Sequence, residues 1–92
     1  MAVPEAIKAM VGNSVVVDTD SHLVYIGKLV ETADDSITLA EVDVHSNVDT
    51  HSSREMYLMD ARKYGVRQNR VGTVILLSRI VSVSKLDDVT NY

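Results

Sequence analysis

Short runs of β-branched and other apolar residues alternate with clusters of polar turn residues along most of the chain. Three of these runs cover Asn13–Thr19, Leu23–Glu31 and Ile37–His45, and the polar clusters Asp18–His22 and Ala33–Ser36 separate them. Runs of this length and composition, bounded by Asp, Ser and Thr, are typical of β-strands joined by tight turns. We therefore predict a meander of three antiparallel strands.

A glycine interrupts the second of these runs. Leu23, Tyr25, Gly27 and Leu29 share one face of the predicted strand. Glycine in the middle of a strand costs stability, and it usually marks a bend or the close approach of another backbone. We expect a sharp bend at Gly27 that lets one long strand serve both halves of a small barrel.

Two further apolar runs, Val74–Leu77 and Ile80–Val83, are separated only by Ser78 and Arg79. Neither run has a helical period and β-branched residues dominate both, which favours two short strands joined as a hairpin by a tight polar corner. Both faces of such a pair are apolar. We expect the hairpin to contribute to the core and to present an edge to another copy of the chain.

Two segments have helical patterns. Val3–Gly12 is predicted to be a short helix, with Pro4 at its first helical position and Gly12 at its end. In the second, Ser52–Glu55 has the pattern of a capping box, and Gly65 follows at a position that suits the end of a helix. A helix from about Ser53 to Tyr64 is predicted there, and the alternative is a strand ending near Met59.

Composition limits the class of protein. The 92 residues predict one domain, and the absence of cysteine excludes a disulfide framework, a thiol nucleophile and a cysteine zinc site. No apolar run approaches the roughly 20 residues that span a bilayer, and Glu5 and Lys8 interrupt any signal-peptide core near the start. The expectation is a soluble cytoplasmic protein without membrane contact.

Charge is unevenly distributed along the chain. The net charge is −4, but Arg54–Arg70 contains five basic and two acidic residues, and the remainder of the chain has a balance of −7. Basic residues interleaved with Tyr57 and Tyr64 can hold a nucleic-acid strand, because bases stack on aromatic rings while cations contact phosphates. The alternatives are a surface that docks an acidic protein and a solvated helix face.

Other candidate chemistry is weak. His22, His45 and His51, with Asp20 and Asp43, lack the spacing of metal ligands and are interpreted as exposed polar residues. The serines have no G-x-S-x-G motif and no phosphate-binding glycine loop is present. We predict neither an enzyme nor a bound metal or cofactor.

The order of elements resembles the Sm-like family. Pro4–Gly12 corresponds to the N-terminal helix, Tyr25–Leu29 matches the φ-x-G-x-L core of the first Sm motif, and Ile80–Val83 matches the last strand. The resemblance implies a mainly β fold, a small open SH3-like barrel of five bent antiparallel strands with an N-terminal helix. It implies a single domain over residues 1–92, with a helical insertion at 46–69 between strands three and four.

Members of this family assemble into rings, in which strand four of one subunit pairs with strand five of the next. The resemblance therefore implies a homo-oligomeric ring of about five to seven subunits. The alternative is a monomer with the hairpin folded inside. The candidate interface residues are Val74, Ile75, Leu76, Leu77, Ile80, Val81 and Val83.

RNA-binding members use an Asp-x-x-apolar-Asn turn after strand two and an Arg-Gly corner between strands four and five. Here Ser36 stands nearest the Asn position, and Leu76-Leu77 replaces Arg-Gly, with Arg79 two places on. The hypothesis is a ring that binds single-stranded RNA without catalysis, at this modified rim or through the basic insertion. The alternative is a scaffold for a partner protein that has lost the RNA site. The candidate RNA-binding residues are Ser36, Ser78, Arg79, Arg62, Lys63, Tyr64, Arg67 and Arg70.

Overall fold

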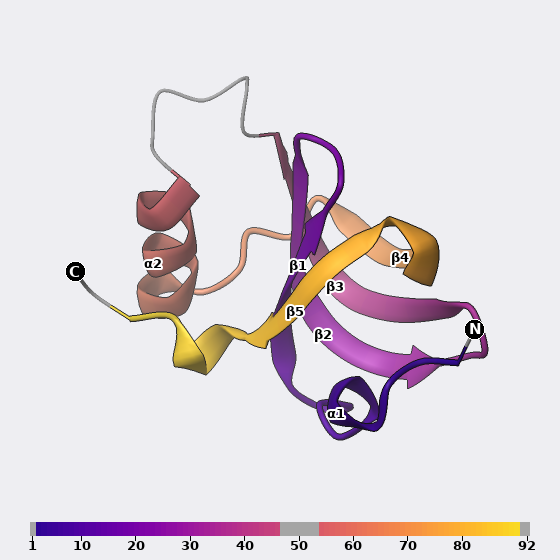
Figure 1. Cartoon of the computed structure of the whole chain (residues 1–92). Helices are drawn as coiled ribbons and strands as arrows, with labels where there is room; N and C mark the ends of the chain where they lie inside the picture. Colours follow the sequence, from indigo (N-terminus) through magenta and orange to yellow (C-terminus); the bar gives the residue numbers. More distant parts are fainter. Residues whose placement is uncertain (1, 47–53, 91–92) are drawn as a thin grey trace.

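The computed structural model describes residues 2–46 and 54–90, and it has one strongly bent β-sheet with helices at its margins (Figure 1). The elements in chain order are α1 (Glu5–Lys8), β1 (Ser14–Thr19), β2 (Leu23–Thr32), β3 (Ser36–Ser46), α2 (Arg54–Tyr64), β4 (Arg70–Leu76), the 3-10 turn η1 (Leu77–Arg79), β5 (Ile80–Lys85) and the 3-10 turn η2 (Leu86–Asp88). Among the described helices, none has the length and apolar character needed to cross a membrane.

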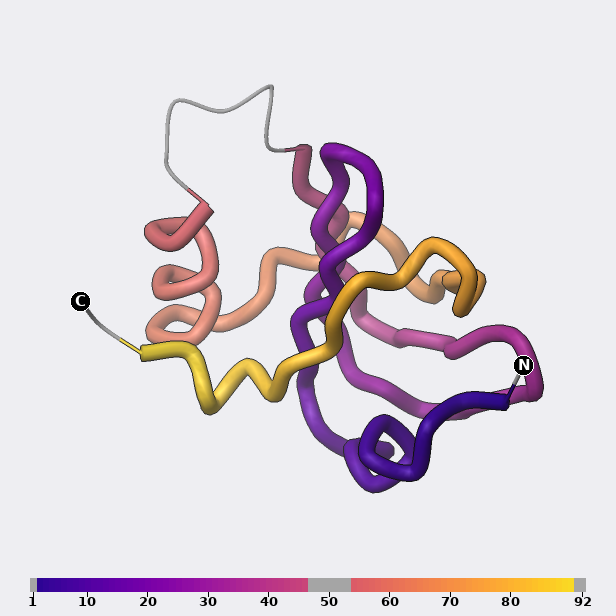
Figure 2. The backbone as a smooth tube through the Cα atoms, in the orientation of Figure 1, coloured from indigo at the N-terminus to yellow at the C-terminus, as the bar shows by residue number. Residues whose placement is uncertain are grey.

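The five strands form a single antiparallel sheet in the order β4-β3-β2-β1-β5. The sheet curls until side chains from all five strands pack on one inner core, as the path of the backbone tube shows (Figure 2). The expected mainly β fold, with five bent strands, an N-terminal helix and a helix between strands three and four, is confirmed.

The predicted hairpin between the last two strands is wrong. β4 pairs with β3, where Leu76 lies opposite Ser36, and β5 pairs with β1, where Val83 lies opposite Val17. The two-residue turns that close hairpins need positive φ angles, which Ser78 and Arg79 do not favour. The chain instead makes the 3-10 turn η1 and crosses to the opposite edge of the sheet.

The N-terminal helix is shorter than predicted. It covers only Glu5–Lys8, and Pro4 is its N-cap rather than its first helical residue. After Lys8 the chain forms turns instead of continuing the helix, because its backbone there hydrogen-bonds to β2. The Gly12 N–H donates to the Leu29 carbonyl at 2.7 Å, and the Leu29 N–H donates to the Asn13 carbonyl at 2.9 Å. Gly12 has the left-handed conformation expected of it, with φ at 95°.

The close approach expected at Gly27 is confirmed. A Cβ atom there would lie 3.0 Å from the Ala40 carbonyl oxygen and 3.2 Å from Cγ2 of Val42. The register of β2 and β3 shifts at this point, and Glu41 takes a positive φ of 54°. Glycine is therefore required because β3 bulges against β2 where the sheet bends.

Two hydrophobic cores lie on opposite sides of β1 and β2. The inner core, enclosed by the curled sheet, consists of Val3, Val15, Val17, Leu29, Ile37, Leu39, Val42 and Ile75. The outer core consists of Val16, Val24, Ile26, Leu58, Ala61 and Leu86. Because alternate residues of a strand point to opposite faces, β1 and the first half of β2 are buried on both sides.

Helix α2 covers the outer core. Its buried residues are Leu58 and Ala61. Gly65, which follows its last residue, has a φ of 93° and donates its N–H to the Ala61 carbonyl at 3.0 Å. The helix predicted from the sequence is confirmed, and the alternative strand ending near Met59 is wrong. Ser52 and Ser53 of the expected capping box lie outside the described residues.

Candidate assembly edges and nucleic-acid surface

The two edge strands expose apolar side chains. Val74 and Leu76 of β4 are 62% and 55% exposed, and Val81 of β5 is 69% exposed. Among the strands that the structure describes, β4 pairs only with β3 and β5 only with β1. Each strand therefore keeps one free row of backbone N–H and C=O groups beside exposed apolar side chains, which is the arrangement that pairs with another chain.

The other predicted interface residues belong to the fold of the single chain. Ile75 is buried in the inner core, and Leu77, Ile80 and Val83 are half-buried and pack against it. As expected, the C-terminal strands both contribute to the core and offer an edge. One set of their side chains packs in the core, and a different set is exposed at the edge. Val74, Leu76 and Val81 are the ones left for a partner.

The structure brings together the two places that form the predicted rim. Ser36 lies opposite Leu76 in the sheet, and the Leu77 N–H donates to the Asp35 carbonyl at 2.8 Å. The turn between β2 and β3 therefore contacts η1, which contains the exposed Ser78 and Arg79.

Arg79 is engaged at this rim by an acidic residue. Its Nη1 lies 3.2 Å from Oδ2 of Asp20, and the Asp20 N–H donates to the Arg79 carbonyl at 3.0 Å. The exposed Asp34 and Asp35 lie in the adjoining turn. Acids next to a paired guanidinium weaken the attraction of this rim for phosphate.

The remaining basic candidates lie on α2, on the connector that follows it and at the start of β4. Arg62 and Lys63 are on the last turn of α2, and Arg67 and Arg70 lie on the connector to β4 and at its start; all four are exposed. We call these four residues the basic surface. In Figure 1, α2 and η1 lie at opposite sides of the molecule, so the basic residues on α2 and the rim do not form one site within a single chain.

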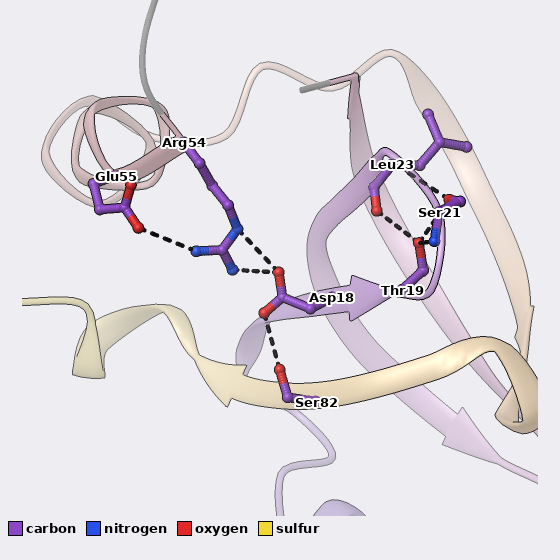
Figure 3. A network of polar contacts seen from close by, with 7 residues as sticks. All are labelled: Asp18, Thr19, Ser21, Leu23, Arg54, Glu55 and Ser82. Atoms are coloured by element: carbon purple, nitrogen blue, oxygen red, sulfur yellow. Dashed lines mark hydrogen bonds and ion pairs between the residues drawn. The ribbon is translucent and has the colours of Figure 1, made fainter. Parts of the chain in front are cut away.

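Arg54 belongs to the basic segment of the sequence but not to this surface. Its Nε donates to Oδ1 of Asp18 at 3.1 Å, its Nη2 contacts the same oxygen, and its Nη1 lies 3.6 Å from the Glu55 carboxylate. The Ser82 hydroxyl donates to the other Asp18 oxygen at 2.9 Å (Figure 3). Asp18 therefore joins α2, β1 and β5, a role that its place in a polar turn cluster did not suggest.

A second polar cluster fixes the other side of α2. The Tyr57 hydroxyl donates to Oδ2 of Asp43 at 2.6 Å, Asn69 Nδ2 donates to Oδ1 of Asp43 at 2.9 Å, and the His45 ring stacks on Tyr57 with centroids 3.7 Å apart. Burial of the phenol raises the pKa of Tyr57 well above its usual value, and the hydrogen bond and negative charge of Asp43 raise it further.

This cluster also accounts for two of the residues considered as metal ligands. Asp43 and His45 are engaged with Tyr57, and the described part of the chain contains no group of three residues placed to hold a metal ion. His51 lies outside the described residues. Asn69 was not identified from the sequence, yet its amide also exchanges hydrogen bonds with the backbone of Val44, at 3.0 and 3.1 Å.

Comparison with known proteins bears on the fold. No family model and no curated protein matches the sequence. The structure is similar to that of an Sm protein from Pyrococcus abyssii solved in complex with a uridine heptamer, with a TM-score of 0.61 and 14% sequence identity. The match covers 88% of this chain and 93% of the other. The Sm-like fold expected from the sequence is therefore confirmed.

Proposed function

We propose that this chain, which has an Sm-like fold, assembles head to tail through the free edges of β4 and β5 into a closed ring of identical subunits. We propose further that the ring binds single-stranded RNA without catalysis, through the basic surface. The observation that carries the proposal is the pair of bare edges, each with exposed apolar side chains, at the two ends of one sheet.

Edge pairing has a clear driving force. Fully burying a Val or Leu side chain contributes about 1.5–3 kcal/mol, and more than half of each of Val74, Leu76 and Val81 is still exposed. Covering them therefore contributes roughly 1–2 kcal/mol each, in addition to the backbone hydrogen bonds. Because the two edges differ, the contact is heterologous, and only a closed ring leaves no edge free.

Two observations support RNA as the ligand. The structurally similar Sm protein is in complex with a uridine heptamer. The segment between Met56 and Arg70 carries the four exposed cations and one acid, Asp60, while Glu41 shares a groove with Arg62 and Asp43 shares one with Arg67. Repetition around a ring would present this charge once per subunit, so that one strand contacts several copies and gains affinity by multivalency.

Fluorescence anisotropy of short labelled RNA at low salt tests the RNA part of the proposal. The double variant Arg62→Gln, Lys63→Gln should lose affinity and lower the slope of log affinity against log salt by about 1 for each phosphate contact removed. Arg79→Gln is the matched control, since it removes an exposed cation at the other end of the molecule. Equal losses in both variants would contradict binding at the basic surface.

A second candidate function is a ring-shaped scaffold for a partner protein. The rim favours it, because Leu76-Leu77 replaces the Arg-Gly corner, Arg79 is paired with Asp20, and further acids adjoin it. The same titration distinguishes the two functions. A scaffold without an RNA site predicts no binding to short RNA even at low salt.

A further inference from the structure

A groove of about 510 Å³ lies beside α2, at the edge of the basic surface. One stripe of the helix forms one wall of it, because Tyr57, Asp60, Ala61 and Tyr64 follow the i, i+3, i+4, i+7 spacing of a single helix face. Arg67, on the connector that follows α2, also lines the groove.

One part of this groove is already occupied by contacts within the protein. Tyr57 and Asn69 each donate to one oxygen of Asp43, and Tyr57 is stacked against His45. These side chains form one wall of the groove, in which the Tyr57 proton is already donated and each Asp43 oxygen already accepts one hydrogen bond.

The rest of the groove holds three side chains that are not engaged. Asp60, Tyr64 and Arg67 make no side-chain hydrogen bond or ion pair with the described residues. Tyr64 is 82% exposed, and it is the last residue of α2. The groove thus offers an aromatic face, a carboxylate that accepts two hydrogen bonds, and a guanidinium that donates them.

We propose that the groove binds a guanine base of a single-stranded RNA that crosses the basic surface, an inference that rests on the proposed function. The base stacks on Tyr64, as bases stack on exposed rings in single-strand binding. The Asp60 carboxylate accepts hydrogen bonds from the adjacent imino and amino groups of guanine. Arg67 donates to the O6 and N7 acceptors on the neighbouring edge, the commonest specific contact of arginine with a base.

Of the four RNA bases, guanine alone matches this set of groups. Uracil has one imino donor flanked by carbonyls, and adenine and cytosine each pair an amino donor with a ring nitrogen that would face the carboxylate lone pairs. A basic protein side chain would pair with Asp60 but would offer no acceptor to the guanidinium of Arg67, so it matches only part of the groove. The groove therefore selects for a base with two adjacent donors and two adjacent acceptors.

Base preference is the first test. Oligouridine carrying one central guanosine should bind about 5-fold to 100-fold more tightly than the same strand with adenosine or cytidine at that place. Asp60→Asn and Tyr64→Leu should remove the preference. Asp34→Asn, which alters an exposed acid in the turn between β2 and β3, should leave it unchanged. RNA binding without any preference for guanosine would overturn the inference and leave the proposed function standing.

Mononucleotides separate the two proposals. Guanosine monophosphate should shift the backbone amide resonances of residues 60–67 in a saturable manner, and uridine monophosphate should not. Such shifts, lost in Asp60→Asn, would support the groove even if longer RNA failed to bind and the proposed function fell. Equal shifts with both nucleotides, or none with guanosine monophosphate, would overturn the inference.

Discussion

Substitution of Leu58 tests whether α2 is an integral part of the fold. Leu58 is 6% exposed and packs in the outer core, and only one other residue of the helix, Ala61, is buried. Leu58→Ala removes three carbons from this contact and leaves a cavity, a change that typically costs about 2–5 kcal/mol. Because a helix at the margin of the molecule can settle into the gap, we expect about 2–3 kcal/mol here.

That loss is large for a domain of this size. Stability of roughly 0.05–0.15 kcal/mol per residue gives about 5–14 kcal/mol for 92 residues. Equilibrium unfolding in urea, followed by circular dichroism, should show a lower midpoint with a similar slope. Tyr64→Leu is the control, because its ring is exposed and its loss should change the free energy of unfolding by less than about 0.5 kcal/mol.

A small loss in the free energy of unfolding has two possible meanings, and hydrogen exchange distinguishes them. A change below about 1 kcal/mol that matches the control would refute the conclusion that α2 seals Val24 and Ile26 from water. Hydrogen exchange shows whether the helix detaches locally, since its amides would then lose protection while those of β1 and β2 keep it. Protection that falls equally in α2 and in the sheet would show one cooperative unit.

Three further changes test other contacts. Gly27→Ala should destabilise the protein by about 1–3 kcal/mol in a thermal melt, because the new Cβ meets the Ala40 backbone, whereas Gly72→Ala meets nothing closer than 3.5 Å and should be tolerated. Asp18→Asn should cost about 1–3 kcal/mol in urea unfolding, as expected when a hydrogen bond to a charged group is lost. Because the pKa of Tyr57 is raised in the folded protein, its contribution to stability is complete below the ordinary tyrosine pKa of about 10 and falls above it. Phenolate absorbance and the melting temperature, both followed against pH, should show this fall. Tyr57→Phe should abolish it.

Local sequence was sufficient for most of the strands. Runs of β-branched residues placed β1, β2 and β3 to within a residue or two, because polar turn residues limit them on both sides. Gly27 was identified as a bend for the correct reason, since only a residue without Cβ fits against the Ala40 carbonyl. Helix α2 was predicted from the capping-box pattern of Ser52–Glu55 and from Gly65 after its last residue.

Strand partners could not be deduced in the same way. The two runs around Ser78 satisfy the pattern of a hairpin, but which strand each one joins depends on how the whole sheet curls. One unused signal was present: Val15, Val16 and Val17 form an unbroken apolar run, as expected for a strand buried on both faces. That signal would have predicted the outer core.

The polar contacts were the least predictable feature. Asp18 is 36 residues from Arg54 and 64 from Ser82, and Asn69 is 26 residues from Asp43. Such pairs have no local signature, because the fold alone brings them together. The groove shows the same limit: Tyr57, Tyr64 and Arg67 belong to one basic segment of the sequence, but the fold alone places all three around one groove.

The mass of the purified protein in solution tests the central claim most directly. Native mass spectrometry should show a single closed assembly of about five to seven copies, independent of concentration, with Val81→Lys reducing it to monomers. Val30→Lys, which changes an exposed valine of the internal strand β2, should leave the assembly intact. A monomer at every concentration, or an open series of growing oligomers, would contradict the pairing of β4 with β5.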